Sequence, residues 1–137
     1  MTDCVFCKIR DGQIPSLRIF EDDRTLAFMD INPVTHGHCL VIPKAHAATL
    51  FEVEVEDLQA TIAAAQQVAR AIREALAPDG LNMLQANGAA AFQSVPHFHL
   101  HLIPRWANDG KGFDWKVVPG NREEIVGTAD RIRTMLG

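Results

Sequence analysis

Three histidines alternate with apolar residues over positions 97–102, and their type and spacing are well suited to chemistry. Successive side chains of a β-strand point to opposite faces, so a strand here places His97, His99 and His101 on one face. The apolar face can pack on a core while three imidazoles line a pocket. Imidazole can ligate a metal, transfer protons near neutral pH, or attack an electrophile. Three histidines in register after a polar loop favour such a role over that of ordinary sheet residues.

Four further segments are expected to form strands that hold the histidine strand in a sheet. Each is a short run rich in apolar residues, and Asp22-Asp23-Arg24 between the first two has the composition of a hairpin turn. Pro43 ends the third run. The expected strands are Arg18–Glu21, Thr25–Met29, Cys39–Ile42 and Leu81–Gln85, with His97–Ile103 as the fifth.

A long helix is expected between the third and fourth strands, because apolar residues recur there at spacings of four and three. Residues 77–80 stop it. A second helix begins near Asn121 and Glu124, which lie where an N-cap and its reciprocal partner would. These elements predict a single α+β domain, residues 1–137, on a five-stranded antiparallel sheet. The residues expected on buried helix faces are Leu58, Ile62, Ala65, Ala69, Ile72 and Leu76, then Ile125, Ala129, Ile132 and Leu136.

The composition excludes several classes of protein. The chain has 137 residues, 47% hydrophobic and 22% charged, which fits one globular domain with a hydrophobic core. Its net charge is −4 without a Lys/Arg block, which argues against binding a nucleic acid polymer but not a small nucleotide. No apolar run is long enough to span a bilayer, and residues 1–4 lack the features of a signal peptide. We therefore expect a cytoplasmic protein that does not bind a membrane.

Cys4 and Cys7 form a CxxC pair, whose spacing alone fits a redox pair, a metal site or two unrelated thiols. A redox motif usually begins a helix after a strand, and no strand is expected before Cys4. A closed structural zinc site needs four ligands. A disulfide framework is not expected from three cysteines in a chain without an export signal. Cys39, on an expected strand, is interpreted as a buried small apolar residue.

Several separated motifs resemble the histidine-triad (HIT) family of nucleotide hydrolases and transferases. The histidine core is preceded by Gln93-Ser94-Val95 and followed by Pro104-Arg105. Segments 19–28, 30–33 and 37–44 also look like the family's N-terminal half, in the right order. Motifs that cover most of a chain are more specific than one short pattern. The resemblance implies the HIT-like fold and is closest to the nucleoside phosphoramidate hydrolase (Hint-like) branch, of the bacterial zinc-containing type.

The resemblance implies a two-step reaction centred on His99. This histidine would attack the α-phosphorus of a purine nucleoside phosphoramidate or related adenylate, forming a covalent nucleotidyl-histidine that water or another acceptor releases. Its far nitrogen should donate to a fixed acceptor, for which a strand carbonyl is the natural candidate. His101 would bind the phosphate oxygens, Ser94 would help to protonate the leaving group, and His38 would orient the catalytic imidazoles. No cofactor is required for these steps.

The resemblance also implies how the nucleotide is bound. The loop that runs from Asn87 to Gln93 and Ser94 would supply amide, hydroxyl and backbone donors to the phosphate, and Gly88 allows a close approach. Asp30 would accept hydrogen bonds from the ribose hydroxyls. The base would lie in an apolar slot formed by Val5, Phe6, Phe28 and Ile31. Spacing alone allows Phe6, Phe28 and Ile31 to be simple core and Asp30 a turn residue, and the resemblance favours binding.

For the CxxC pair the resemblance supplies two further ligands. They are the histidine of the Pro-Lys-x-His stretch and the first histidine of the triad. Cys4, Cys7, His46 and His97 would then form a structural Cys2His2 zinc site that joins the N-terminus to the catalytic strand. On this interpretation His97 is a ligand and not a catalyst.

Other features bear on substrate scope and assembly. Phe92 stands where many family members have glycine, and its ring would narrow the phosphate loop or cover the leaving-group side. The family is usually dimeric through the strand after the long helix, which implies a homodimer joined through residues 81–85. Trp106 and Trp115 pack near the pocket or at a subunit interface, and the C-terminal helix belongs to the core, the interface or both.

Other functions remain open at this point. Related branches of the family cleave dinucleoside polyphosphates of the Ap3A and Ap4A type, or transfer nucleotides to phosphate or sugar phosphate. Outside enzymes, the alternatives are a non-catalytic purine-nucleotide-binding module and a zinc-stabilised interaction module. The presence of His99 beside Ser94 and His101 favours the hydrolase, because a sensor needs no nucleophile. AMP and GMP derivatives are the expected ligands.

Overall fold

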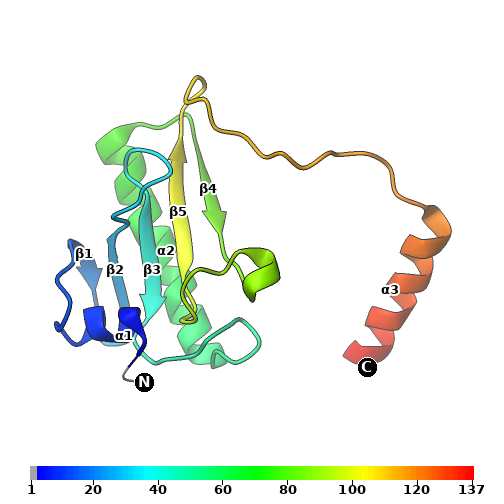
Figure 1. Ribbon diagram of the computed structural model, residues 1–137, viewed down its shortest axis with the longest axis horizontal. Coiled ribbons are helices and arrows are strands. Elements are labelled where there is room, and N and C mark those ends of the chain that lie inside the picture. The colour runs from blue at the N-terminus through cyan, green and yellow to red at the C-terminus, as the bar shows by residue number, and fades with distance from the viewer. Residues whose placement is uncertain (1–2) are drawn as a thin grey trace.

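The computed structural model describes residues 3–137, so Met1 and Thr2 of the N-terminal stretch considered above lie outside the described residues. In this range the strands form one antiparallel sheet in the order β1-β2-β3-β5-β4 (Figure 1). The sheet, the long helix and the C-terminal helix confirm the predicted α+β fold. The elements are α1 (Val5–Arg10), β1 (Arg18–Glu21), β2 (Thr25–Met29), β3 (Cys39–Pro43), α2 (Val55–Leu76), β4 (Gly80–Leu84), a 3-10 turn η1 (Ala89–Ala91), β5 (Leu100–Arg105) and α3 (Arg122–Leu136).

The strand that carries the histidines is shorter at its start than predicted. β5 begins at Leu100, so the first two histidines of the triad precede it. The amide of Phe98 donates to Ala47 O at 2.7 Å, and that of His97 donates to Val95 O at 2.8 Å. These amides are therefore used by the neighbouring loops, and the sheet ladder starts only after His99. β1 and β2 match their predicted bounds, β3 includes Pro43, and β4 lies one residue earlier than expected.

The period-two alternation of the central strands produces a separate hydrophobic cluster on each face of the sheet. On one face, Ala27, Val41 and Leu100 pack with α2. On the other face, Phe28 and Leu40 pack with residues of α1. Because alternate side chains of a strand point to opposite faces, β2 and β3 contribute to both clusters, and β5 adds Leu100 to the α2 side. The histidines lie on the α1 face, so α2 supports the strands that position them from behind.

The long helix α2 buries a stripe that is rotated slightly from the predicted one. Ala65 and Ile72 are buried as expected, but Ile62 is 42% exposed. The buried face instead runs through Thr61, Ala64 and Val68. Small residues at these positions let the helix approach the sheet closely, which leaves the larger Ile62 at the margin. The helix ends at Ala77, in the left-handed conformation with φ +48°, within the predicted stop.

The C-terminal helix α3 does not bury the face predicted for it. Ile125, Ile132 and Leu136 are 57%, 57% and 81% exposed, and Ala129 is half-buried. An extended connection without regular structure follows β5 and carries α3 past the β4 edge, well away from the sheet (Figure 1). Asn121 caps the helix as predicted, its Oδ1 accepting from Glu124 N at 3.0 Å. The helix is thus locally well specified, but its apolar face has no contact surface on its own sheet.

Across residues 3–137, no helix combines the length and the apolar character needed to cross a lipid bilayer.

Candidate active site and metal site

The three histidines of the triad project to the α1 side of the sheet, as the alternation predicted. The ring of Phe6 lies 6.0 Å from that of His97 and 5.0 Å from that of His99, measured between centroids. The rings of His99 and His101 lie 4.8 Å apart. Phe98, between His97 and His99 in the chain, points to the opposite face. Its side chain is 1% exposed and packs in the core with α2.

A backbone carbonyl fixes the tautomer of His99. Its Nδ1 lies 2.7 Å from His97 O, and because a carbonyl only accepts, Nδ1 carries the proton. The acceptor is a backbone carbonyl, as predicted, but it belongs to the loop before β5 and not to a strand, and Nε2 keeps its lone pair. Burial lowers the pKa of His99 below its usual range, against an opposing effect of the hydrogen bond to His97 O. His99 is therefore held neutral with a free lone pair on Nε2.

A chain of hydrogen bonds fixes the opposite tautomer in His101. Val34 N donates to His38 Nδ1 at 3.0 Å, so the proton of a neutral His38 is on Nε2. That nitrogen lies 3.0 Å from His101 Nδ1 and 3.4 Å from the carboxylate of Asp30. Donation to His101 Nδ1 leaves the proton of His101 on Nε2, ready to donate. Burial, aided by the neighbouring His99, lowers the pKa of His101 to about 4.

His99 and His101 line a cavity of about 340 Å³ on the α1 face of the sheet. This volume is at the lower end for small-molecule sites, which suits one nucleotide. Its walls are mainly apolar, and the rings of Phe6 and Phe28 meet edge to face at 5.4 Å. Of the residues predicted to bind substrate, the cavity brings together Val5, Phe6, Phe28, Asp30, Ile31, Ser94, His99 and His101.

The alternatives left open for the slot are both partly realised. Phe6 and Phe28 are core residues, 6% and 3% exposed, and line the cavity as well. Ile31 is 86% exposed and lies at the rim. Asp30 closes a turn by accepting from Asn32 N at 2.8 Å, while its other carboxylate oxygen faces His38. One carboxylate therefore serves both the turn and the site.

Asn87 and Gln93 do not line the cavity, because their side chains organise the loop before the triad. Gln93 Oε1 accepts from Gly88 N at 2.8 Å, and its Nε2 donates to Ala48 O at 2.7 Å and to Val95 O at 3.1 Å. Asn87 Oδ1 accepts from Leu50 N at 2.7 Å. Both amides thus join the 85–95 loop to the 45–54 loop and hold it beside the histidines.

The second cluster consists of the four residues predicted as zinc ligands. Their four donor atoms lie within 4.8 Å of one another. His97 Nδ1 lies 3.3 Å from Cys4 Sγ, 3.6 Å from Cys7 Sγ and 3.3 Å from His46 Nδ1. The edges of a tetrahedron with zinc bonds of roughly 2.0–2.3 Å are about 3.3–3.8 Å long. The donor set and its spacing therefore fit a tetrahedral zinc ion.

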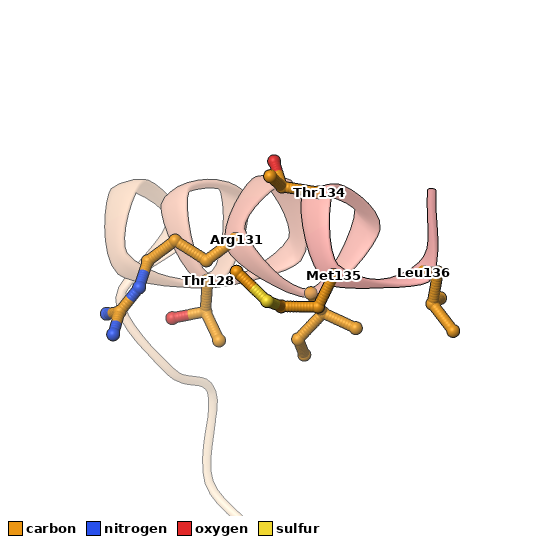
Figure 2. A pocket seen from close by; sticks show the side chains of 6 residues that line it. Thr128, Arg131, Thr134, Met135 and Leu136 are labelled. Atoms are coloured by element: carbon orange, nitrogen blue, oxygen red, sulfur yellow. The ribbon is translucent and has the colours of Figure 1, made fainter.

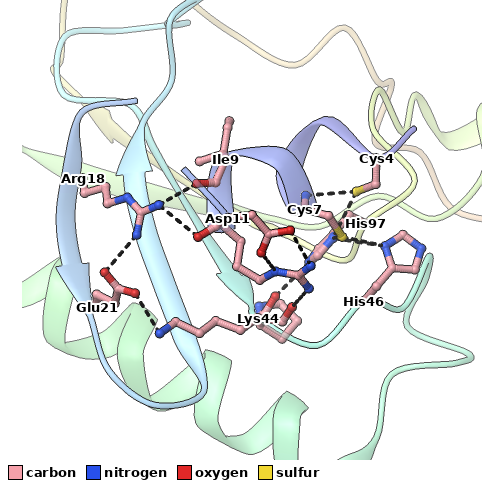
Figure 3. Close-up of polar contacts among 11 residues, drawn as sticks. Cys4, Cys7, Ile9, Asp11, Arg18, Glu21, Lys44, His46 and His97 are labelled. Atoms are coloured by element: carbon pink, nitrogen blue, oxygen red, sulfur yellow. Dashed lines mark hydrogen bonds and ion pairs between the residues drawn. The ribbon is translucent and has the colours of Figure 1, made fainter. Parts of the chain in front are cut away.

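The surroundings of these donors also suit a structural site (Figure 3). His97 Nε2 donates to Pro43 O at 2.8 Å, which directs the lone pair of Nδ1 at the thiols, as a second-shell acceptor does for a metal-bound histidine. Burial raises the pKa of Cys7 and lowers that of His97 to about 4. Cys39 is fully buried outside the cluster, and burial raises its pKa to about 11, as expected for a small core residue.

The short helix α1 is the element that the sequence did not reveal, and it contributes to both sites. It carries Cys7 to the sulfur cluster and Phe6 and Ile9 to the cavity wall. Arg10 fastens it to the sheet by donating to Lys44 O at 2.7 Å (Figure 3). Six residues are fewer than two helical turns, so no periodicity marks the helix in the sequence. The one available signal was a single apolar pair at helical spacing, Val5 and Ile9, which is too short to count as a periodic pattern.

Fold and site together define a class of protein: an antiparallel sheet with a histidine cluster at the start of β5 that faces a nucleotide-sized cavity. The HIT domain profile matches residues 11–108, and the chain belongs to the HIT family.

Known relatives agree with this assignment. The adenosine 5'-monophosphoramidase hnt1 of Schizosaccharomyces pombe is 39% identical over 134 residues, which cover 97% of this chain and 98% of that protein. A crystal structure of a HIT family member from Bacillus subtilis is 43% identical, with a TM-score of 0.91 over 98% of both chains. A zinc-bound histidine triad protein from Mycobacterium smegmatis is 44% identical, with a TM-score of 0.77, covering 90% of this chain and 87% of that one. The family thus includes a named phosphoramidase and a zinc-bound member.

Proposed function

We propose that this chain is a hydrolase that cleaves purine nucleoside phosphoramidates, or related adenylates, at the α-phosphate through a covalent nucleotidyl-histidine at His99. The observation that carries the proposal is the pair of opposite tautomers in the cavity. His99 presents a lone pair on Nε2, and His101 beside it presents an N–H. A nucleophile and a donor fixed side by side suit displacement at an anionic phosphorus. The similarity to the hnt1 phosphoramidase supports the same substrate class.

The first step forms one bond to phosphorus and breaks another. His99 Nε2 donates its lone pair to the α-phosphorus, and the phosphorus–nitrogen bond of the substrate breaks. The amine leaves with that electron pair and takes a proton, for which the Ser94 hydroxyl at the cavity wall is the donor. His101 Nε2–H stabilises the phosphoryl oxygens as their charge rises.

In the second step, water attacks the same phosphorus and His99 leaves as a neutral imidazole. The proton lost by water restores the donor used in the first step, so the products are the nucleoside monophosphate and the amine. Dinucleoside polyphosphates would react by the same step with a phosphate leaving group, and they belong in the same substrate panel.

The test compares wild type with His99→Ala on adenosine 5'-phosphoramidate, with AMP binding measured by calorimetry. We expect turnover to fall by at least about 10³-fold, as for loss of other catalytic nucleophiles, while AMP still binds. His36→Ala is the matched control, because His36 is exposed and lies outside both clusters. Equally slow turnover by wild type and His99→Ala, with AMP still bound, would instead indicate a nucleotide-binding module.

We further propose that Cys4, Cys7, His46 and His97 bind a structural zinc ion. The tetrahedral spacing of their donor atoms and the zinc-bound relative from Mycobacterium smegmatis support this. When bound, zinc would hold both thiolates and join α1 to the loop before β5, and it would take no part in the phosphoryl transfer. Elemental analysis of wild type, Cys4→Ser and Cys39→Ser checks the proposal. One zinc per chain should be present in wild type and Cys39→Ser, and equal content in all three proteins would contradict it.

We also propose a homodimer, with β4 at the joint. β4 is an edge strand with Leu81, Met83 and Leu84 between 37% and 47% exposed. Beyond it, α3 carries an exposed apolar face that includes Ile132 and Met135, and this face borders an open hollow (Figure 2). A second copy joined at β4 would place its own surface under this helix. The Bacillus subtilis structure matches over 98% of the chain, α3 included, which supports a defined position for the helix.

Light scattering tests the dimer. We expect wild type to have twice the chain mass and Ile132→Asp, on the apolar face of α3, to shift it towards the monomer. Thr134→Asp, about 160° away around the helix, is the matched control. A monomeric wild type would contradict the proposal.

A further inference from the structure

Phe92 combines two unfavourable features, a strained backbone and an exposed aromatic ring. Its backbone is left-handed, with φ +65° and ψ +31°, a conformation that bulky side chains rarely adopt. Its side chain is 89% exposed, so the ring gains no burial in return. Backbone strain at an exposed aromatic residue points to a functional contact. Among residues 3–137, Ala77 is the other non-glycine with positive φ, and it ends a helix.

The ring is nevertheless held in a defined place. Phe92 N donates to Ala89 O at 3.0 Å at the end of η1, and Gln93 N donates to Gly88 O at 3.1 Å. The Gln93 side chain then fastens the turn to Gly88 and to the 45–54 loop, as described above. Phe92 therefore projects from a rigid turn, and its exposure is not that of a loose loop tip. Of the two effects expected for the ring, narrowing the phosphate loop or covering the leaving-group side, the first does not occur, because a ring this exposed does not fold into the loop.

The position of this turn relative to the cavity indicates what the ring contacts. The base slot lies on the α1 and β2 side of the histidines, where Phe6 and Phe28 form its wall. The segment with η1 lies on the other side, next to the end of β4 (Figure 1). Ser94 lines the cavity two residues after Phe92, so their Cα atoms are at most about 7 Å apart. A group bound to the α-phosphate and directed away from the nucleoside therefore extends towards Phe92.

We propose that Phe92 is a specificity-determining residue that stacks on the leaving group, and that it selects leaving groups with a flat aromatic ring a short distance from the phosphorus. This inference rests on the proposed function, because it assigns the far half of the same substrate. An aromatic pair would add about 2- to 12-fold to binding beyond the area it buries. The bond changes are those already given, with an alkylamine that carries an aryl ring in place of ammonia as the group that leaves.

The test is a substrate pair measured on four proteins. The substrates are adenosine 5'-phosphoramidate and its N-(2-arylethyl) derivative, and the proteins are wild type, Phe92→Ala, Phe92→Asn and Phe92→Tyr. We expect the ratio of kcat/KM, arylethyl over unsubstituted, to fall about 3- to 10-fold in the Ala and Asn variants and to be retained in Tyr. Asn is the matched control for the backbone, because it tolerates the left-handed conformation without offering a ring.

The outcomes separate this inference from the proposed function. If wild type cleaves neither substrate, the proposed function fails. If wild type cleaves both and the ratio stays constant in all variants, the assignment of Phe92 is overturned. It is equally overturned if Phe92→Ala changes the mass in light scattering but not the ratio, because the ring is then a subunit contact. Diadenosine triphosphate serves as a third substrate, and a loss in the Ala and Asn variants confined to it would also overturn the assignment, since the ring would then serve a distant base.

Discussion

Removing the side chain of Gln93 should loosen the 85–95 loop without disturbing the positions of the histidines. This amide makes three hydrogen bonds, to Gly88 N, Ala48 O and Val95 O. Two of them brace the 85–95 loop internally and the one to Ala48 O links it to the 45–54 loop, and Ser94 follows directly in the chain. Gln93→Ala removes all three, while the contacts that fix His99 and His101 do not involve Gln93. The expected effect is therefore on the placement of Ser94 and the loop amides around the phosphate.

The magnitude follows from the number of bonds and their exposure. A typical intramolecular hydrogen bond contributes about 0.5–1.5 kcal/mol net, so three give at most about 4.5 kcal/mol. Gln93 is half-buried, and water replaces part of what the substitution removes. A net loss of about 1–2 kcal/mol then remains in the free energy that holds the loop in place. If the transition state loses the same amount of stabilisation, kcat/KM falls roughly 5- to 30-fold.

The assay is steady-state hydrolysis of adenosine 5'-phosphoramidate, with thermal unfolding measured in parallel. Gln85→Ala is the matched control, because Gln85 is also half-buried and also makes three hydrogen bonds, all to Ala86 and Asn87. We expect less than about a threefold effect from it, since none of its bonds reaches the 45–54 loop directly. Equal losses in both variants, or full activity in Gln93→Ala, would refute the positioning role of Gln93.

Four further predictions follow from single contacts. Asp30→Ala should lower kcat/KM by about tenfold for a ribonucleoside substrate and much less for its 2',3'-dideoxy analogue, because a carboxylate that binds hydroxyls has nothing to bind in the analogue. Phe98→Ala should reduce the urea-unfolding free energy by about 3–5 kcal/mol, since this ring is 1% exposed in the core. Gly37→Ala should destabilise by about 1–3 kcal/mol in the same assay, because φ is +88° and the added Cβ would lie 2.4 Å from Leu76 Cδ1. A strong zinc chelator should lower the Tm of wild type and leave that of Cys4→Ser unchanged.

The sequence predicted what depends on periodicity and residue type. Alternation placed the triad on one face and Phe98 on the other, and the runs around β1, β2 and β3 gave strand positions to within a residue. The same reasoning was wrong for His97 to His99, which precede β5. There the amide of Phe98 donates to Ala47 O, and no local sequence pattern connects the loop that contains Ala47 to the triad. Tertiary hydrogen bonds decided where the strand begins.

Two further differences have the same physical origin. The apolar stripe of α3 predicted that Ile125 and Ile132 are buried, but an amphipathic face only indicates that something should cover it. Whether the cover belongs to the same chain depends on the connection that precedes the helix, and this one carries it past β4. In α2, small residues decided the depth of packing, so Ala64 is buried while Ile62 remains at the margin.

The division of labour among the three histidines is set by atoms that the HxHxH pattern does not contain. Each imidazole has one nitrogen fixed, and the identity of that nitrogen decides which one is free. Pro43 O occupies Nε2 of His97 and leaves Nδ1 for the thiols, whereas His97 O occupies Nδ1 of His99 and leaves Nε2 for phosphorus. For His101 the fixing partner is His38, which donates to Nδ1 where a carbonyl would accept. The free Nε2 of His101 therefore carries a proton. Equal spacing therefore specifies a shared face, and the backbone acceptors together with His38 give three identical side chains the different free nitrogens that the proposed ligand, nucleophile and donor each require.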